Sequence, residues 1–249
     1  MSGPVGLRFL GTSGFAVTTE AGTQVLFDPL IDGTEAIPPS PVTIDDLAGA
    51  AAVLVSHAAS DHLGQALEIC AAGDATLVCG PEVRMEALAA GLAEDRIAKV
   101  FPGARIEIAG MSIKTLAAVH LSMLPTADGY VSGVPLSFIV ETDGGTRIYH
   151  SGDTALFGDL RLYGELYRPD LALLCVGATE PMLTPMEPAE AAIAADWLDA
   201  PVAVPMHYIP GDDAPVRFTE ALAERRGDIE ARTLAEGEET VVDVARPRT

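Results

Sequence analysis

The sequence predicts an α/β fold in which short strands alternate with helices, and three observations support this prediction. The chain has 249 residues, of which 49% are hydrophobic, so it can bury a large core. Short apolar runs typical of strands alternate with segments that carry the start and stop signals of helices. Residues 15–25 also match residues 138–148, which suits two similar halves, each a sheet flanked by helices. No linker, low-complexity tract or long charge run divides the chain, so we expect residues 1–249 to form one domain.

Three strands are predicted near the start of the chain, over residues 7–10, 15–19 and 24–28, where apolar and β-branched residues are concentrated. Residues 20–23, Glu-Ala-Gly-Thr, predict a hairpin turn between the second and the third strand. Within the internal match, Phe, Val, Thr, Gly and Thr fall in register. A second hairpin of the same kind is therefore expected over residues 138–148.

Three helices are predicted from the residues at their ends. Residues 81–90 begin with a proline and are followed by a glycine. The stretch Thr184-Pro185-Met186-Glu187 has the spacing of a capping box and leads into a helix over residues 189–198. Residues 213–226 begin with an aspartate, carry a proline in the first turn and are followed by a glycine.

The composition narrows the partners that the protein can bind. Its formal net charge is −21, which argues against nucleic acid and against an anionic membrane, since both attract Lys and Arg. Cys70, Cys79 and Cys175 have no Cys-x-x-Cys spacing and indicate reduced core residues of a cytosolic protein. We find neither a signal peptide nor an apolar run of about 20 residues, so we expect a cytoplasmic protein with a small-molecule substrate. The oligomeric state stays open, a homo-oligomer included.

Residues with metal-ligating side chains follow several of the apolar runs. The stretch Ser56-His57-Ala58-Ala59-Ser60-Asp61-His62-Leu63-Gly64 comes directly after residues 51–55, which predict a buried strand. Three further residues complete the set: His120 after the run 115–119, Asp153 in His150-Ser151-Gly152-Asp153-Thr154, and His207 after the run 201–206. The chain has five histidines, and four of them belong to this set. Imidazole and carboxylate groups from several strand ends favour a metal site.

This set resembles the metallo-β-lactamase superfamily, in which a strand-end loop reads His-x-His-x-Asp-His and is followed by a lone His, a lone Asp and a last His. Within it, the chain looks most like small metal-dependent hydrolases related to L-ascorbate-6-phosphate lactonase. The matching pieces, in the order of the family, are Leu10-Gly11-Thr12-Ser13-Gly14-Phe15, Phe27-Asp28-Pro29, Asp61-His62-Leu63-Gly64, Tyr149-His150-Ser151-Gly152-Asp153-Thr154 and Pro205-Met206-His207-Tyr208. The resemblance implies a four-layer αββα sandwich with two mixed β-sheets and metals at one edge. It departs at Ala59, where the family has its second His.

Carried over by position, the resemblance implies two metal sites that share one aspartate. The first would use His57, His120 and Asp153, and Ala59 offers it no donor. The second would use Asp61, His62, Asp153 and His207, all of which are present. We therefore expect zinc, with manganese or iron as alternatives. Either one ion is bound at the second site, or a second, weakly held ion is also bound at the first.

The resemblance implies a hydrolase that uses a metal-bound hydroxide on a small ester, lactone, amide or phosphodiester. If the first site is empty, His57 and His120 are candidate general bases, and Asp61 is a candidate for orienting the water or passing a proton. The alternative is a degenerate member that binds a metal or a metabolite without turnover, and Ala59 keeps this alternative open. His150 is expected to form hydrogen bonds beside the site rather than to bind metal.

Two further expectations concern the surroundings of the site. Asp28, which precedes a proline, is expected to hold the loops below the site by accepting backbone N–H bonds. The connection over residues 178–186 is longer and more acidic than in the family, which indicates a rebuilt substrate pocket. Within it, Glu180 is either a solvated loop acid or the oxygen ligand that the first site lacks.

Overall fold

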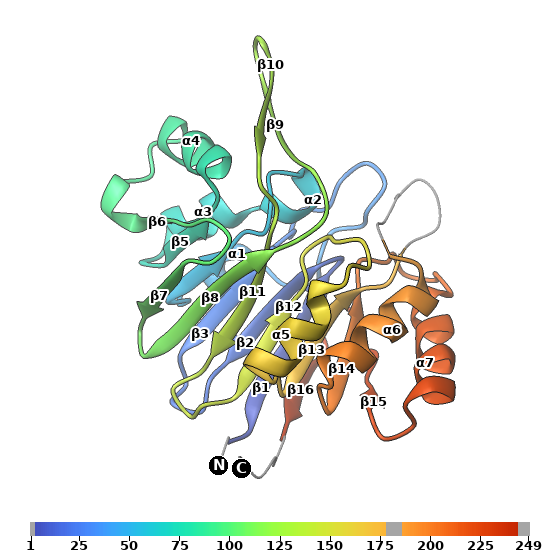
Figure 1. The fold of residues 1–249 in the computed structure, drawn as a ribbon. Coiled ribbons are helices and arrows are strands. Elements are labelled where there is room, and N and C mark those ends of the chain that lie inside the picture. The colour runs from blue at the N-terminus through green and yellow to red at the C-terminus, as the bar shows by residue number, and fades with distance from the viewer. Residues whose placement is uncertain (1–2, 178–185, 244–249) are drawn as a thin grey trace.

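The computed structural model describes residues 3–177 and 186–243. Two seven-stranded β-sheets lie face to face, and helices cover their outer sides, which gives a four-layer αββα sandwich (Figure 1). Both sheets contain parallel and antiparallel neighbours, so the fold class expected from the sequence is confirmed.

The first sheet comes from the N-terminal part of the chain together with the last strand. Its strands, in the order in which they pair, are β16 (Glu239–Val242), β1 (Val5–Gly11), β2 (Gly14–Thr18), β3 (Gln24–Phe27), β4 (Ala52–Leu54), β5 (Thr76–Cys79) and β6 (Ile97–Lys99). The second sheet consists of β7 (Arg105–Ile108), β8 (Met111–Ala117), β11 (Leu136–Glu141), β12 (Arg147–His150), β13 (Leu171–Cys175), β14 (Val202–Met206) and β15 (Glu230–Ala231). A separate hairpin projects beyond the sheets and consists of β9 (Ser122–Thr126) and β10 (Gly129–Gly133) (Figure 1).

The two sheets repeat one topology. From β16 to β6, the first three strand pairs are antiparallel and the last three are parallel. The same sequence of pairings runs from β7 to β15. The strands β2 and β3 therefore correspond to β11 and β12, which are the strands of the two matched sequence segments. The internal match in the sequence is a structural repeat.

The turns of the two matched hairpins have the same hydrogen bonds. In each turn the first threonine N–H donates to the carbonyl oxygen of the second threonine, at 2.8 Å for Thr19 and Thr23 and at 2.9 Å for Thr142 and Thr146. In the reverse direction, the N–H of the second threonine donates to the hydroxyl of the first, at 3.2 and 2.9 Å. The Thr19 hydroxyl also donates to Asp143 at 2.9 Å, so the two turns are joined across the interface between the halves.

Apolar side chains fill two layers of the sandwich. The main core lies between the sheets, and its largest fully buried side chains include Phe9, Phe15, Phe27, Phe138 and Tyr149. A second cluster covers the outer face of the first sheet and includes Leu26, Leu47, Val53, Ile69 and Leu77. The parallel strands β4, β13 and β14 are buried along their whole length, as expected for parallel strands covered on both faces.

The helices lie close to where the sequence predicts them. They are α1 (Ile44–Leu47), α2 (Ser60–Leu63), α3 (Ala66–Ala72), α4 (Pro81–Ala89), α5 (Asp159–Tyr167), α6 (Pro188–Leu198) and α7 (Ala214–Arg225), with a 3₁₀ turn at Glu94–Arg96. The three predicted helices correspond to α4, α6 and α7. The N-cap of α6 is Glu187, which forms a capping box with Glu190, and the predicted capping residue Thr184 lies outside the described residues. No helix within the described ranges is long and apolar enough to cross a bilayer.

One strand expected from the sequence has other bounds in the structure, and one hairpin was not expected. The strand expected over residues 115–119 is β8, which begins earlier and ends at Ala117, and Val119 beyond it is exposed. The β9–β10 hairpin was not predicted because its strands project from the sheets and are largely exposed, so they lack an apolar run. Its one sequence signal is Asp128-Gly129, a common hairpin dipeptide.

Gly64 marks a close approach between two loops that carry site residues. It ends α2 with φ 44° and ψ −129°, a conformation that suits glycine alone. A Cβ at this position would lie 2.3 Å from the carbonyl oxygen of Pro29. The next residue, Gln65, donates its N–H to that same oxygen at 2.9 Å. The loop after β3 is therefore held against the end of α2.

We expect Gly64→Ala to lower the free energy of unfolding by at least about 2–3 kcal/mol, because it combines backbone strain with a backbone clash. Gly22→Ala is the matched control, since Gly22 also has a positive φ of 86° but has nothing within 4 Å of a built Cβ. The control should lose only about 1 kcal/mol. Urea unfolding of both variants measures the difference, and equal losses would contradict the role of the close approach.

Candidate metal centre

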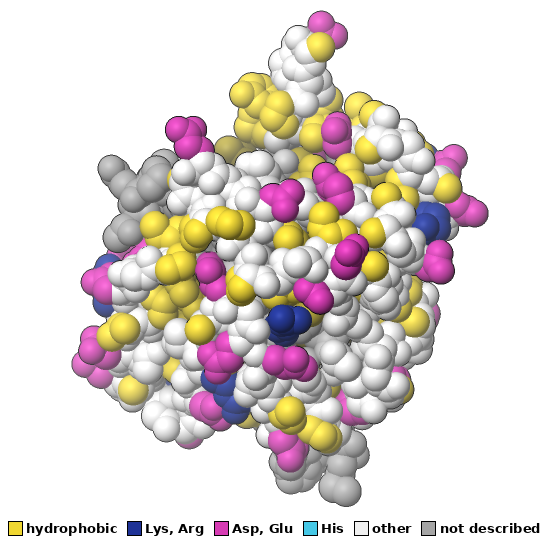
Figure 2. Space-filling model, turned by 180° about the vertical axis from the view of Figure 1, so that it is seen from behind, with side chains coloured by type: hydrophobic (Ala, Val, Ile, Leu, Met, Phe, Trp, Pro, Cys, Tyr) yellow, Lys and Arg dark blue, Asp and Glu magenta, His cyan; other side chains and the backbone are white. Residues whose placement is uncertain are grey.

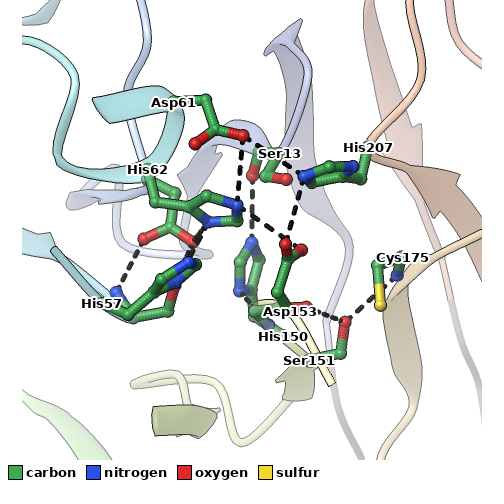
Figure 3. Close-up of polar contacts among 12 residues, drawn as sticks. Ser13, His57, Asp61, His62, His150, Ser151, Asp153, Cys175 and His207 are labelled. Carbon is green, nitrogen blue, oxygen red and sulfur yellow. Dashed lines mark hydrogen bonds and ion pairs between the residues drawn. The ribbon is translucent and has the colours of Figure 1, made fainter. Parts of the chain in front are cut away.

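Side chains with metal-ligating atoms gather where strands of both sheets end at one edge of the sandwich. Each of them follows a strand: His57, Asp61 and His62 follow β4, His120 follows β8, Asp153 follows β12, and His207 follows β14. Figure 3 shows Asp61, His62, Asp153 and His207 directed toward one another. The structure therefore brings together all six residues proposed from the sequence.

Four of these groups have ligating atoms close to one another. His207 Nε2 lies 3.3 Å from an Asp61 oxygen and 3.2 Å from an Asp153 oxygen. His62 Nε2 lies 3.4 Å from the other Asp153 oxygen and 3.8 Å from Asp61. Neighbouring ligands about 2.0–2.1 Å from a tetrahedral metal are roughly 3.3 Å apart, and the three shorter contacts have about this length. The two imidazoles contact different Asp153 oxygens, and among the four residues Asp61, His62 and His207 are the three whose ligating atoms lie within 4.8 Å of one another.

The atoms that face this centre are buried and make no hydrogen bonds within the described residues. They are His57 Nε2, His62 Nε2, Asp153 Oδ1 and His207 Nε2. A buried polar atom without a hydrogen bond costs about 1–3 kcal/mol, so a group of them in one place needs an explanation. A bound cation, which accepts several lone pairs at once, provides that explanation. The residues present therefore fit a metal.

The charges of the site shift the pKa values of its members in opposite directions. Burial raises the pKa of Asp153, but the neighbouring His207 and His62 hold it well below its usual range. Burial lowers the pKa of His207, but Asp153 and Asp61 raise it to about 9. Asp61 also has a lowered pKa, because His62 and His207 outweigh the effect of burial. The carboxylates are thus stabilised in the charged form that a cation binds.

His57 lies next to His62, and His120 lies next to His57 and Asp153. The ring centroids of His57 and His62 are 4.1 Å apart, and those of His57 and His120 are 5.1 Å apart. His120 Nε2 lies 3.6 Å from Asp153 Oδ2. Burial, together with the neighbouring His62, lowers the pKa of His57 to about 3, so His57 is a neutral imidazole.

The metal-ligating atoms form two overlapping groups. Atoms of Asp61, His62 and His207 lie within 4.8 Å of one another, and so do atoms of His57, His62 and Asp153. His62 belongs to both groups, whereas the resemblance assigned it to the second site only. Ala59 lies at the N-cap of α2 and contributes no side-chain hydrogen bond there. Glu180, the other candidate for the first site, lies outside the described residues.

A buried carboxylate and hydroxyl orient the two imidazoles of the first loop. Asp28 Oδ2 lies 2.7 Å from His62 Nδ1, and its two oxygens also accept from the N–H and the hydroxyl of Ser56, both at 2.7 Å. Since the Ser56 hydroxyl donates to Asp28, it accepts from His57 Nδ1 at 3.0 Å. Both rings therefore carry their proton on Nδ1 and present the lone pair of Nε2 to the centre.

This orienting role goes beyond the expectation for Asp28. The sequence predicted that Asp28 accepts backbone N–H bonds, and it does so from Ser56, but its shortest contacts also include an imidazole. Ser56 was not identified from the sequence as a functional residue, although it directly precedes His57.

Three of the six non-glycine residues with positive φ in the described part of the chain lie beside the centre. Thr12, Asp28 and His207 are non-glycine residues with positive φ, of 50°, 40° and 65° respectively. The N–H of His207 donates to the carbonyl oxygen of Thr12 at 2.6 Å, so the turn after β1 fixes the strained turn after β14. Strained backbone of this kind collects at functional sites, where the surrounding fold enforces it.

His150 occupies the position expected of it, beside the centre and fully buried. Its Nδ1 accepts from the Gly152 N–H at 3.1 Å, so its Nε2 carries the proton and donates to the carbonyl oxygen of Ser13 at 3.0 Å. The ring stacks on Phe27 with centroids 4.9 Å apart. With both nitrogens engaged, His150 has no lone pair for a metal.

Comparison with known proteins identifies the family. The beta-lactamase superfamily domain matches residues 23–208. The chain belongs to this superfamily. A protein named "UPF0173 metal-dependent hydrolase" from Rubrobacter xylanophilus is 33% identical over 246 residues, which is 96% of this chain and 97% of the relative. A protein of the same name from Methanopyrus kandleri is 36% identical over 238 residues, covering 93% of this chain and 97% of the relative.

A solved structure agrees with these relatives. Igni18, described as a novel metallo hydrolase from the archaeon Ignicoccus hospitalis, superposes with a TM-score of 0.78 at 28% identity and covers 96% of this chain and 99% of that one. The chain is accordingly a metal-dependent hydrolase with the metallo-β-lactamase fold.

We expect Asp28→Asn to weaken zinc binding by about 10–100-fold, because the substitution removes the charge that holds the proton of His62 on Nδ1. Competition with a chromogenic chelator measures the affinity. Asp74→Asn serves as the matched control, since Asp74 is exposed and distant in sequence from every proposed ligand. An unchanged affinity in a folded Asp28→Asn protein would contradict the orienting role.

Proposed function

We propose that this chain is a zinc hydrolase that holds one ion tightly, through Asp61, His62, Asp153 and His207, and acts on small uncharged substrates. The observation that carries the proposal is that ligating atoms of Asp61, His62 and His207 lie within 4.8 Å of one another. The Asp153 oxygens lie 3.4 and 3.2 Å from the Nε2 atoms of His62 and His207. Imidazole nitrogen and carboxylate oxygen are ligands that suit zinc, and the same set also accepts manganese or iron.

A divalent ion held there would act as a Lewis acid and lower the pKa of a coordinated water to about 7. The residues of the chain would then supply positioning and proton transfer. Asp61, whose side chain is 23% exposed, is the ligand nearest to solvent and is placed to accept a hydrogen bond from an incoming water. His120 is 26% exposed, so a proton accepted at its imidazole can pass to bulk water. His57 is enclosed and is better suited to hold a second ion or a water through its bare Nε2.

The charge of the chain supports an uncharged substrate. With a formal net charge of −21, long-range repulsion slows the approach of polyanions. The three cysteines are free and buried, which supports a place in the reducing cytosol.

The competing candidate is a degenerate protein of the same fold that binds a metal or metabolite without turnover. The loss of a family ligand at Ala59 favours it, whereas the six retained polar residues and their orienting network argue for catalysis. Hydrolysis of a panel of chromogenic esters, lactones, amides and phosphodiesters, with and without a chelator, separates the two. Binding of zinc without chelator-sensitive turnover on any class would overturn the proposal.

We expect Asp61→Ala to lose bound metal and His57→Ala to keep most of it, because Ala59 weakens only the group to which His57 belongs. Elemental analysis of both variants and of the wild type decides this, after dialysis against metal-free buffer. Wild-type protein with two tightly held ions, and equal metal loss in both variants, would contradict a single tight ion.

We expect Ala59→His to raise the zinc content toward two ions per chain and to lower turnover of the preferred substrate. The new imidazole would complete the first site, engage His57 and His120, and fill space beside Asp61. Metal content and turnover are measured together, with Ala59→Gln as the matched control that adds bulk without an imidazole. A variant with two ions and higher activity would show that Ala59 is a defect of the site.

A further inference from the structure

A cleft opens beside the metal centre where the family would place its missing histidine. It has a volume of about 480 Å³ and lies between α2, α4 and β9. The residues that line it are Ala58, Ala59, Ser60, Asp61, Leu63, Glu86, Met123, Leu124 and Pro125. Asp61 lines the cleft and is also one of the proposed ligands, so the cleft borders the metal centre. The methyl group of Ala59 leaves open the space that a larger side chain would fill.

The wall of the cleft is anchored by a buried carboxyl group. Ser122, at the start of β9, donates its hydroxyl proton to Glu82 of α4 and accepts from the N–H of Ala58 at 3.1 Å. Glu82 and Ser122 are each 1% exposed. Gly133, at the end of β10, packs against the Glu82 carboxyl so closely that a Cβ could not be accommodated. The hairpin base, α4 and the metal-binding loop are thus joined, and the cleft is formed before any ligand arrives.

The lining is chiefly apolar, with carboxylates at its margin. Met123, Leu124 and Pro125 come from one strand, and Leu63 and Ala59 come from the opposite side. The charged residues among the lining are Glu86 and Asp61, both acidic. Figure 2 shows the same character more broadly, with apolar side chains at the base of the projecting hairpin and acidic side chains outnumbering basic ones. An apolar, uncharged group gains from burial here, and an anion is repelled.

We infer that this cleft is the subsite for the apolar part of an uncharged acyl substrate, an ester, lactone or amide with an alkyl or aryl chain. The inference rests on the proposed hydrolase and deepens it, because it favours these substrates over anionic phosphodiesters. Ala59 is then a specificity-determining residue. Alanine in place of the family's histidine at position 59 removes a ligand from the first metal site. It also leaves the space that the alkyl or aryl group of the substrate fills.

The first experiment measures binding without turnover. 2-Octanone, which cannot be hydrolysed, is titrated into zinc-loaded protein, and the methyl resonance of 13C-labelled Met123 is followed by NMR. Saturable shifts are expected for the wild type and for Met85→Ala, whereas Ala59→Leu should weaken binding at least tenfold. Met85 is the matched control because it is also a half-exposed methionine beside the cleft residue Glu86, but it does not line the cleft. Absence of saturable binding, or equal binding to the wild type and Ala59→Leu, would overturn the subsite.

The second experiment measures kcat/KM for 4-nitrophenyl esters from acetate to octanoate. Each added methylene should raise kcat/KM about threefold to fourfold until the cleft is filled. Ala59→Leu should flatten this dependence with its zinc content unchanged, and Met85→Ala should keep it. A flat dependence in the wild type would overturn the subsite while leaving the hydrolase intact. Binding of 2-octanone without turnover of any ester would instead overturn the proposed function and leave the subsite standing.

Discussion

The candidate metal centre depends on the positions of three protons, those on His62 Nδ1, the Ser56 hydroxyl and His57 Nδ1. Asp28 accepts from His62 and Ser56, and Ser56 in turn accepts from His57, so each imidazole turns a bare nitrogen inward. Without this network the rings could rotate or exchange tautomers, and the inward atoms would no longer converge as lone pairs. The network is fully buried, which costs free energy because its polar groups lose their contacts with water. The hydrogen bonds among its members offset this cost. The affinity of the site for a cation is thus expected to depend on Asp28 and Ser56, which orient the ligands but are not ligands themselves.

The fold supplies the second constraint through its internal repeat. Parallel strands end at the same edge of a sheet, and the two halves present these edges to one another, so short loops from both halves meet. Phe27 and His150 end corresponding strands, β3 and β12, and their rings stack on each other across the interface. One half contributes the loop with His57, Asp61 and His62, and the other contributes His120, Asp153 and His207. The centre thus lies at the junction of the two halves.

Much of this could be predicted from the sequence because ligand types and strand ends leave local signals. The motif around Asp61 and His62, the order of the later ligands and the repeated Thr-x-x-Gly-Thr turn identified the fold and gathered the site residues. The role of Ser56 could not be predicted, since a serine at a strand end is common and its significance comes from a contact with Asp28, 28 positions away. The β9–β10 hairpin escaped prediction for a related reason, because its strands lack an apolar run and its base is held by a contact between Ser122 and Glu82, 40 positions away.

Ala59 concerns both the first metal group and the cleft beside it. A histidine there would supply a nitrogen to the first metal group, but its ring would also stand at the mouth of the cleft lined by Met123 and Leu63. In the proposed function, alanine gives up the ligand and opens the cleft in one substitution. His57, His120 and the Ser56 contact that orients His57 are all present in the structure. All three remain in place around a site with one ligand fewer. This retention favours an exchange of metal affinity for substrate space over the loss of a function.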